Sequence, residues 1–169
     1  MNSLSNSLPG SIEFSHIGYV VDDLDKYITY FSDLFKISKF ISYDYTPDIA
    51  YADGTQIEDC RLRLALGASD IYDFSIEIIQ PGTGDTPHKR YLEENGSGLN
   101  HIAFCVSNYD AYRSALIEME GSRIIFEADF TDDIKGRRRS FYITNPMLAG
   151  VMEITEIPTS LRTPENSSI

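Results

Sequence analysis

Two histidines and two glutamates occupy matching places in two parts of the sequence. His16 and His101 lie 85 residues apart, in segments that align with each other without gaps. Glu77 and Glu153 each stand between two large apolar residues, in the triplets Ile-Glu-Ile and Met-Glu-Ile. Successive side chains on a strand point to opposite faces, so each glutamate lies on the face opposite its apolar neighbours. If that face lines a cavity, the carboxylate needs a partner, because burying an unpaired charge is very costly.

One divalent cation would satisfy all four side chains at once. Two imidazoles and two carboxylates suit a borderline-to-hard ion, such as Co, Ni, Mn, Zn or Fe. An octahedral ion held by these side chains would keep open positions, through which a substrate could chelate with two adjacent oxygens. The metal would then act as a Lewis acid that stabilises the oxyanion of an enolate or enediolate. We therefore predict a metal site formed by His16, Glu77, His101 and Glu153.

The third histidine, His88, has no counterpart in the other half of the sequence. It lies in the polar stretch Thr-Pro-His-Lys-Arg and is predicted to be a surface residue. A single histidine or glutamate on a strand is more often solvated than bound to a metal. Recurrence in both halves is what favours the ligand interpretation for the other four residues.

The two histidine segments each predict a strand that runs into a helix. Apolar residues at intervals of three and four positions mark the helices. The first helix carries Leu24, Tyr27, Ile28, Phe31, Leu34 and Phe35, and the second carries Tyr112, Ala115, Leu116 and Met119. Gly121 predicts the end of the second helix. The predicted N-caps are Asp22 or Asp23 in the first helix, and Ser107 or Asn108 in the second.

Three strands are expected after each helix, because β-branched and aromatic residues gather there. They are Lys36–Tyr45, Asp59–Leu66, Phe74–Gln80, Arg123–Glu127, Arg138–Thr144 and Val151–Ile157. The sequence therefore predicts a tandem duplication, with modules at about residues 12–81 and 99–158. A connector at 82–98 carries a short helix around Pro87–Glu94. The tails, 1–11 and 159–169, are rich in polar residues and proline and are predicted to be disordered.

The overall charge of the protein argues against some classes of binding partner. The 169 residues include 26 acidic and 14 basic side chains, a net charge of −12. Such a surface repels nucleic acids and anionic membranes, so neither is an expected partner. Two cysteines, Cys60 and Cys105, fit a reducing cytoplasm better than a disulfide scaffold. The sequence shows neither a signal peptide nor an apolar run of about 20 residues that could span a bilayer, and we expect a cytoplasmic protein.

Taken together, the motifs resemble the vicinal oxygen chelate superfamily, which includes glyoxalase I, methylmalonyl-CoA epimerase, extradiol dioxygenases and fosfomycin- and bleomycin-resistance proteins. The resemblance covers residues 13–157, and its motifs are Ser15–Leu24, Ile76–Pro81, Gly98–Val106 and Gly150–Ile154. It implies an α+β fold in which two tandem β-α-β-β-β modules form one open, curled, mixed β-barrel. Homodimers are common in this superfamily, and the resemblance extends that expectation to this chain.

Within the superfamily the resemblance is strongest to methylmalonyl-CoA epimerases. It places His16, Glu77, His101 and Glu153 on the metal positions, and implies that Glu153 or Glu77 carries the proton. The implied function is an isomerase or lyase that acts through a metal-stabilised enolate, on an acyl-CoA or a 2-oxo acid derivative. Such epimerases can use a second carboxylate from the third strand of the first module. This chain has Arg61 and Arg63 there, and arginine, with a pKa above about 12, is a poor general base.

Basic residues supply candidate contacts to an anionic substrate. Arg61 and Arg63 would need an anionic partner if they faced into the barrel. Arg137, Arg138 and Arg139 form a run that could hold a phosphate or carboxylate. The same run could instead be a solvated turn, paired with the neighbouring Asp129, Asp132 and Asp133.

Two other functions of the same fold stay open. A resistance-type protein would bind an antibiotic or another small molecule without reaction, but it has no need of all four ligand residues. An extradiol dioxygenase would use iron, and its sites resemble two histidines and one glutamate. The four recurring ligand residues favour the isomerase or lyase.

Overall fold

The structure, a computed structural model, describes residues 10–132, 136–148 and 150–156. The elements of the first half are β1 (Ile12–Val20), α1 (Leu24–Phe35), β2 (Phe40–Tyr45), β3 (Ile49–Ala52), β4 (Thr55–Gln56), β5 (Leu62–Ala68) and β6 (Ser75–Pro81). The connecting helix α2 (Pro87–Asn95) follows, and then β7 (Gly98–Val106), α3 (Tyr109–Ile117), β8 (Arg123–Asp132), β9 (Gly136–Asn145) and β10 (Gly150–Glu156).

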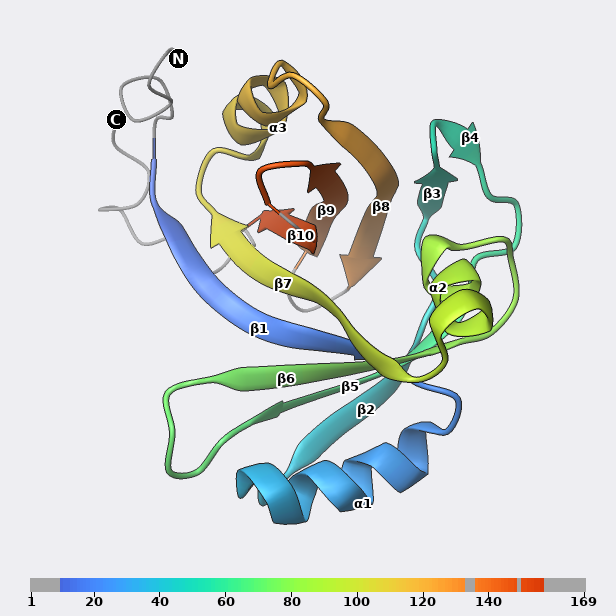
Figure 1. The fold of residues 1–169 in the computed structure, drawn as a ribbon, viewed down its shortest axis with the longest axis vertical. Helices are drawn as coiled ribbons and strands as arrows, with labels where there is room; N and C mark the ends of the chain where they lie inside the picture. Colours follow the sequence, from blue (N-terminus) through green and yellow to red (C-terminus); the bar gives the residue numbers. More distant parts are fainter. Residues whose placement is uncertain (1–9, 133–135, 149, 157–169) are drawn as a thin grey trace.

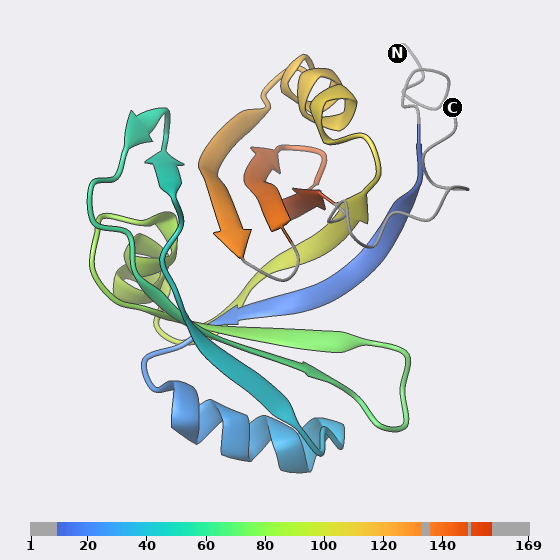
Figure 2. The same cartoon turned by 180° about the vertical axis from the view of Figure 1, so that it is seen from behind.

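The strands of this described part form one mixed sheet in the order β2-β5-β6-β1-β7-β10-β9-β8-β3-β4. Figure 1 shows that the sheet curls into an open barrel, with α1 below one part of it and α3 above the other. Figure 2 shows the same barrel from behind. The predicted α+β fold with an open, curled, mixed barrel is confirmed.

The internal duplication is visible in the strand order. The first half is arranged as β2-β5-β6-β1 and the second as β8-β9-β10-β7, so each half places its last strand beside its first. Both of these inner pairs, β1 with β6 and β7 with β10, are parallel. The antiparallel pairing of β1 with β7 joins the two halves. The four strands at the centre of the sheet are therefore the ones on which the repeated histidines and glutamates lie.

A hairpin, β3–β4, was not predicted and breaks the symmetry of the two halves. Its turn contains Asp53 and Gly54, with φ of 51° and 79°, and Asp-Gly is a strong hairpin signal in a sequence. The hairpin crosses to the other half, where β3 pairs with β8. Its strands are short, which is why the pattern of alternating residues did not reveal them.

The helices α1 and α3 are held to the sheet by the apolar stripes that the sequence predicts. Leu24 and Phe31 of α1 are buried, as are Tyr112 and Leu116 of α3. The buried part of the α1 cluster is Val21, Leu24, Phe31, Ile37, Ala65, Ile76 and Ile78. The buried part of the α3 cluster is Val106, Tyr109, Tyr112, Leu116, Phe141, Ile143 and Ile154.

Several element boundaries differ from the predictions. Lys36 does not begin a strand, because it caps α1 in the left-handed conformation with φ of 55°. The second of the two repeated helices, α3, ends at Ile117, before Gly121. The strands β8 and β9 are longer than predicted because they pair with each other over most of their length. The N-caps are Asp23 and Asn108, whose side chains accept from backbone N–H groups in the first turn.

Some predictions concern residues that the structure does not describe. Of the two tails, only residues 10 and 11 are described, and the N–H of Ser11 donates to Ser107 Oγ. Ile157, at the end of the last predicted strand, also lies outside the described residues. Within the described part, Cys60 and Cys105 are free thiols, and none of the helices there has the length and apolar character needed to cross a membrane.

The pairing of β1 with β7 requires a glycine at one position. Gly18 lies opposite His101 in this pair. A Cβ atom at Gly18 would lie 1.9 Å from Cε1 and 2.1 Å from Nε2 of His101. The imidazole ring therefore occupies the space in which any larger residue would place its side chain.

We predict that Gly18→Ala lowers the free energy of unfolding by about 1–3 kcal/mol, because the buried ring of His101 must move to accommodate the methyl group. Gly150→Ala is the matched control, since its Cβ would have no heavy atom nearer than 4.0 Å. Chemical denaturation of both variants measures the difference. An equal effect at the two positions would contradict the argument.

Candidate metal centre

Four side chains from the four central strands converge inside the barrel. His16 lies on β1, Glu77 on β6, His101 on β7 and Glu153 on β10. All four are buried, with exposed fractions between 2% and 8%. One nitrogen or oxygen atom from each lies within 4.8 Å of the others. The structure thus brings together the four residues that the sequence predicts as metal ligands.

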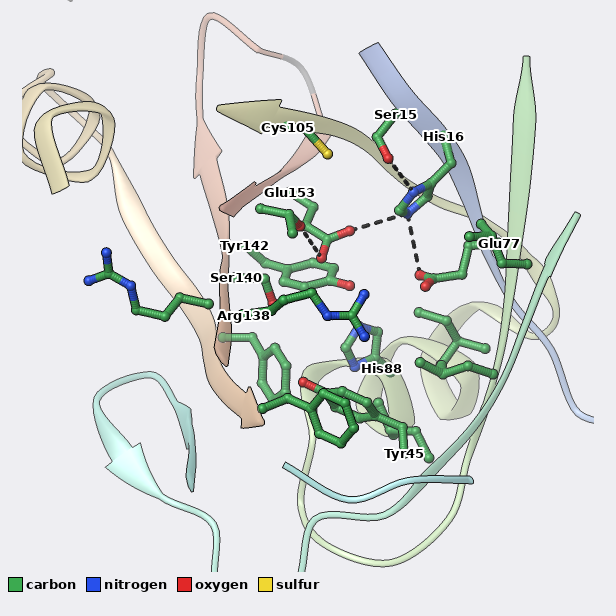
Figure 3. Close-up of a pocket in the computed structure, with 18 of the residues that line it drawn as sticks. Ser15, His16, Tyr45, Glu77, His88, Cys105, Arg138, Ser140, Tyr142 and Glu153 are labelled. Carbon is green, nitrogen blue, oxygen red and sulfur yellow. Dashed lines mark hydrogen bonds and ion pairs between the residues drawn. The ribbon is translucent and has the colours of Figure 1, made fainter. Parts of the chain in front are cut away.

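The distances within this cluster suit the ligands of one ion. His16 Nε2 lies 3.2 Å from Glu153 Oε2 and 3.4 Å from Glu77 Oε2. His101 Nε2 lies 3.4 Å and 3.6 Å from the same two oxygens, and 3.4 Å from His16 Nε2. Ligand atoms about 2.1 Å from an octahedral ion are separated by about 3.0 Å when adjacent and about 4.2 Å when opposite. Figure 3 shows His16 between the two carboxylates.

One atom of the cluster has an unsatisfied hydrogen-bonding capacity. Glu153 Oε2 is buried, and no hydrogen bond of acceptable geometry reaches it from the described residues, although both histidine Nε2 atoms are close to it. An unsatisfied buried carboxylate oxygen is costly. A cation among the four ligand atoms would satisfy it, so the residues present fit a divalent metal ion.

Neighbouring polar groups orient the ligand side chains. Asn100 Oδ1 lies 3.0 Å from His101 Nδ1, and because this oxygen only accepts, the Nδ1 carries the proton and Nε2 is left for a metal. Ser15 Oγ lies 3.0 Å from His16 Nδ1, and Thr155 Oγ1 donates to Glu153 Oε1 at 3.1 Å. Such outer contacts fix the ring orientation and the tautomer of metal-binding histidines.

The cluster keeps its carboxylates ionised. Burial alone would lower the pKa of His16, but Glu77 and Glu153 outweigh it and raise that pKa to about 10. Burial alone would raise the pKa of Glu77, but His16 and His101 outweigh it and lower that pKa to about 2. The same two histidines lower the pKa of Glu153 despite its burial. Both glutamates are therefore anionic at neutral pH, which is the form that binds a cation, and a cation that binds His16 would displace the proton from its ring.

A cavity of about 340 Å³ opens above the cluster. One wall is aliphatic and is formed by Leu62, Leu64, Leu66 and Ile79. Tyr43 and Tyr45 of β2 extend this wall, because they pair with Leu64 and Leu62, while β8 and β9 contribute the aromatic residues Phe126, Phe130 and Tyr142. Arg138 and Arg139 also line the cavity, and the guanidinium of Arg138 lies 5.6 Å from the centre of the Phe130 ring. A polar floor with largely apolar walls is typical of a site for a small molecule.

Two of the predicted anion-binding arginines lie outside this cavity. On β5, Arg63 lies between the buried Leu62 and Leu64 and points outward, and Arg61, the residue before β5, is exposed. Arg61 Nε lies 2.9 Å from Asp59 Oδ1, and Arg63 contacts Gln80 and Asp25. Their side chains are 67% and 46% exposed. The structure therefore does not support an anion contact inside the barrel for this pair.

The run Arg137, Arg138 and Arg139 on β9 was interpreted either as an anion-binding site or as a solvated turn. The three side chains divide between these two interpretations. Arg137 pairs with Asp129, as expected for a solvated pairing. Arg139 lines the cavity but its guanidinium is held by Asp110 and Glu156, each at 2.8 Å. Arg138 reaches into the cavity near Tyr142, as Figure 3 shows.

His88 is not a surface residue, and that prediction is wrong. It is 2% exposed and lines the cavity. His88 lies in the first turn of α2, and Tyr91 and Leu92, which share its side of the helix, pack against the sheet. The spacing of these three residues was the signal that could have identified it. The polar residues beside it in the sequence masked that pattern.

Solved structures of other proteins have a similar fold. Methylmalonyl-CoA epimerase from Mycobacterium tuberculosis has a TM-score of 0.62 and 23% identity, over 95% of this chain and 96% of that chain. A variant of the epimerase from Streptomyces coelicolor, in complex with 2-nitronate-propionyl-CoA, has a TM-score of 0.60 and 20% identity, over 89% and 97%. A variant of 4-hydroxymandelate synthase from Streptomyces coelicolor has a TM-score of 0.56 and 12% identity, over 86% of this chain and 48% of that one.

No curated protein sequence matches the chain. Residues 15–141, however, match the family model of the Glyoxalase/Bleomycin resistance protein/Dioxygenase superfamily. This match covers most of the sequence and reaches from the first module into the second, as far as β9. The chain therefore belongs to the glyoxalase/bleomycin resistance protein/dioxygenase superfamily.

Proposed function

We propose that the protein is a divalent-metal-dependent isomerase or lyase that transfers a proton at a carbon next to a carbonyl group. The observation that carries the proposal is the convergence of two buried imidazoles and two ionised carboxylates, of which His16, Glu77 and Glu153 line the floor of a cavity. The metal, when bound to His16, Glu77, His101 and Glu153, would supply Lewis-acid polarisation of substrate oxygens.

Glu153 is the proposed proton carrier. Thr155 holds its Oε1, while its Oε2 faces the shared centre without a hydrogen bond from the described residues. A carboxylate with one fixed and one available oxygen can take a proton from a bound substrate and return it. Glu77 is the second candidate, because it lies at the same floor and is also ionised.

The distribution of carboxylates favours a single base. Among the described residues that line the cavity, one carboxylate is present besides Glu77 and Glu153. It belongs to Glu156, which Arg139 holds through two hydrogen bonds. The wall that β5 contributes consists of Leu62, Leu64 and Leu66, which have no proton to give. A reaction in which one group removes and returns the proton on the same face of the substrate agrees with this arrangement.

Arg138 is the proposed contact for an anionic group of the substrate. It lines the same cavity as the floor cluster and contacts the Tyr43 hydroxyl, whose pKa is raised to about 12 by burial. A carboxylate is the natural partner of a guanidinium in such a place. We propose a 2-oxo acid derivative or the acyl part of an acyl-CoA as substrate; the complex of a similar epimerase with 2-nitronate-propionyl-CoA supports the second.

We predict that Co²⁺, Ni²⁺, Mn²⁺, Zn²⁺ or Fe²⁺ raises the thermal stability of the metal-free protein. Binding at a concentration 100 times the Kd would add about 2.7 kcal/mol to the free energy of unfolding. Glu153→Gln should weaken metal binding by more than about tenfold, because it removes an anionic ligand. Differential scanning calorimetry and metal analysis measure both effects.

Glu94→Gln is the matched control for metal binding, since Glu94 is exposed on α2 and does not line the cavity. It should bind metal as the wild type does. Failure of every one of these ions to bind or stabilise the wild type would refute the proposed function.

We predict that the metal-loaded protein exchanges the proton next to the carbonyl group of its substrate with solvent deuterium. Candidate substrates are 2-oxo acids and acyl-CoA thioesters, followed by mass spectrometry. Glu153→Gln, at saturating metal, should slow exchange by about 100-fold or more, as expected for loss of a general base. A substrate deuterated at that carbon should retain part of its label in the product, because a single base returns what it removes. Full exchange activity in the variant would show that Glu153 is not the base.

We predict that Arg138→Gln raises the KM by about 10- to 100-fold, because a charged hydrogen bond to the substrate is lost. The kcat should change less, since Arg138 does not carry the proton. Arg137→Gln is the control, because Arg137 pairs with Asp129 and does not line the cavity. Steady-state kinetics on the substrate found by exchange would test both variants, and equal effects would rule out this role for Arg138.

A further inference from the structure

His88 has two buried ring nitrogens that no group in the described part of the protein satisfies. Both Nδ1 and Nε2 are inaccessible to solvent and lack a hydrogen-bond partner there. The side chain nevertheless lines the cavity that contains the floor cluster, and Figure 3 shows it below Arg138. Buried polar groups are nearly always paired, so each exception calls for an explanation.

The position of the ring is fixed by its surroundings. Phe126 and Tyr142 pack edge-to-face against it, with ring centres 5.2 Å and 5.0 Å away. Thr86 caps α2 by accepting from the Lys89 N–H, which holds the helix turn on which His88 stands. The nitrogens therefore cannot find partners by a simple rotation of the side chain into solvent.

The imidazole is neutral in this environment. Burial, together with the nearby His101, lowers the pKa of His88 to about 4. The first turn of a helix also disfavours a positive charge. A neutral imidazole offers one N–H donor and one nitrogen acceptor, and it does not compete with a cation for the carboxylates of Glu77 and Glu153.

We propose that His88 is a substrate-binding residue, which forms a hydrogen bond with an uncharged oxygen, a hydroxyl or carbonyl group, of the molecule bound in the cavity. Arg138 offers a charged contact and His88 an uncharged one to a molecule in this cavity. The substrate would therefore carry a further hydroxyl or carbonyl oxygen besides the groups that meet Arg138 and the floor. The proposal rests on the proposed function for the nature of that substrate.

The test compares ligands that differ by a single hydroxyl group. Pyruvate is paired with hydroxypyruvate, and longer 2-oxo acids with their ω-hydroxy forms. Their affinities for the Zn²⁺-loaded protein are measured by calorimetry in the wild type, His88→Leu and His88→Gln. Leucine has a volume close to that of histidine without its nitrogens, and glutamine restores a donor and an acceptor.

In the wild type, the hydroxylated member of at least one pair should bind about tenfold more tightly than its parent. His88→Leu should abolish that advantage and leave the affinity for the parent unchanged, while His88→Gln should restore most of it. The ¹⁵N resonances of the wild-type His88 ring should shift with the hydroxylated ligand. An advantage that persists in His88→Leu, or the lack of any advantage in the wild type, would overturn the proposal.

Thermal unfolding separates this role from a structural one. His88→Leu should keep or raise the unfolding midpoint of the ligand-free protein, because it removes buried polar atoms that lack partners. A lowered midpoint with an unchanged hydroxyl advantage would assign His88 a structural role instead. None of these measurements requires turnover. Deuterium exchange in which the hydroxylated substrate keeps the same advantage over its parent in His88→Leu as in the wild type would refute this proposal alone, and a hydroxyl advantage in binding that depends on His88, without any exchange, would refute the proposed function alone.

Discussion

Two carboxylates and two imidazoles are buried at one point, and the need to compensate their charges constrains the rest of the structure. Taking each ion out of water costs several kcal/mol, and removing one partner from such a group costs about 3–5 kcal/mol. The four residues sit on four neighbouring strands, so the backbone hydrogen bonds of the sheet fix their spacing. Because Gly18 has no side chain, the His101 ring fits into the β1–β7 pairing that joins the two halves. Each half supplies one histidine and one glutamate, and the complete set exists only when β1 and β7 are paired.

The lining of the cavity above this point combines apolar and polar groups. The part from β5 offers only methyl and methylene groups, whereas the Arg138 guanidinium, tyrosine hydroxyls and the His88 imidazole offer polar contacts. A ligand would therefore be oriented by these polar contacts and by its shape against the leucines. Exclusion of water by this lining strengthens the electrostatic interactions at the floor.

The sequence predicts the parts of this arrangement that repeat. His16 and His101 could be identified because their segments align, and the module order followed from the same repeat. Features that occur once were missed: the hairpin turn at Asp53, and His88, whose polar sequence neighbours suggested exposure. The sequence also left open whether Arg63 faces into the barrel, because the position of a residue along a strand does not reveal which face the register turns to the cavity. That register depends on pairing between distant strands.

The crossing of the β3–β4 hairpin has a consequence for how the chain reaches its native state. Ile49 pairs with Asp129, so a strand of the first half finds its partner 80 residues later in the sequence. Asp53, at the hairpin turn, also forms ion pairs with Arg90 and Arg123. During synthesis the hairpin has no neighbouring strand until β8 has been made. Long-range pairing of this kind slows folding, since the chain loses the conformational entropy of a long loop before the contacts that compensate this loss can form. We therefore expect the duplicated halves to fold as one cooperative unit rather than in succession.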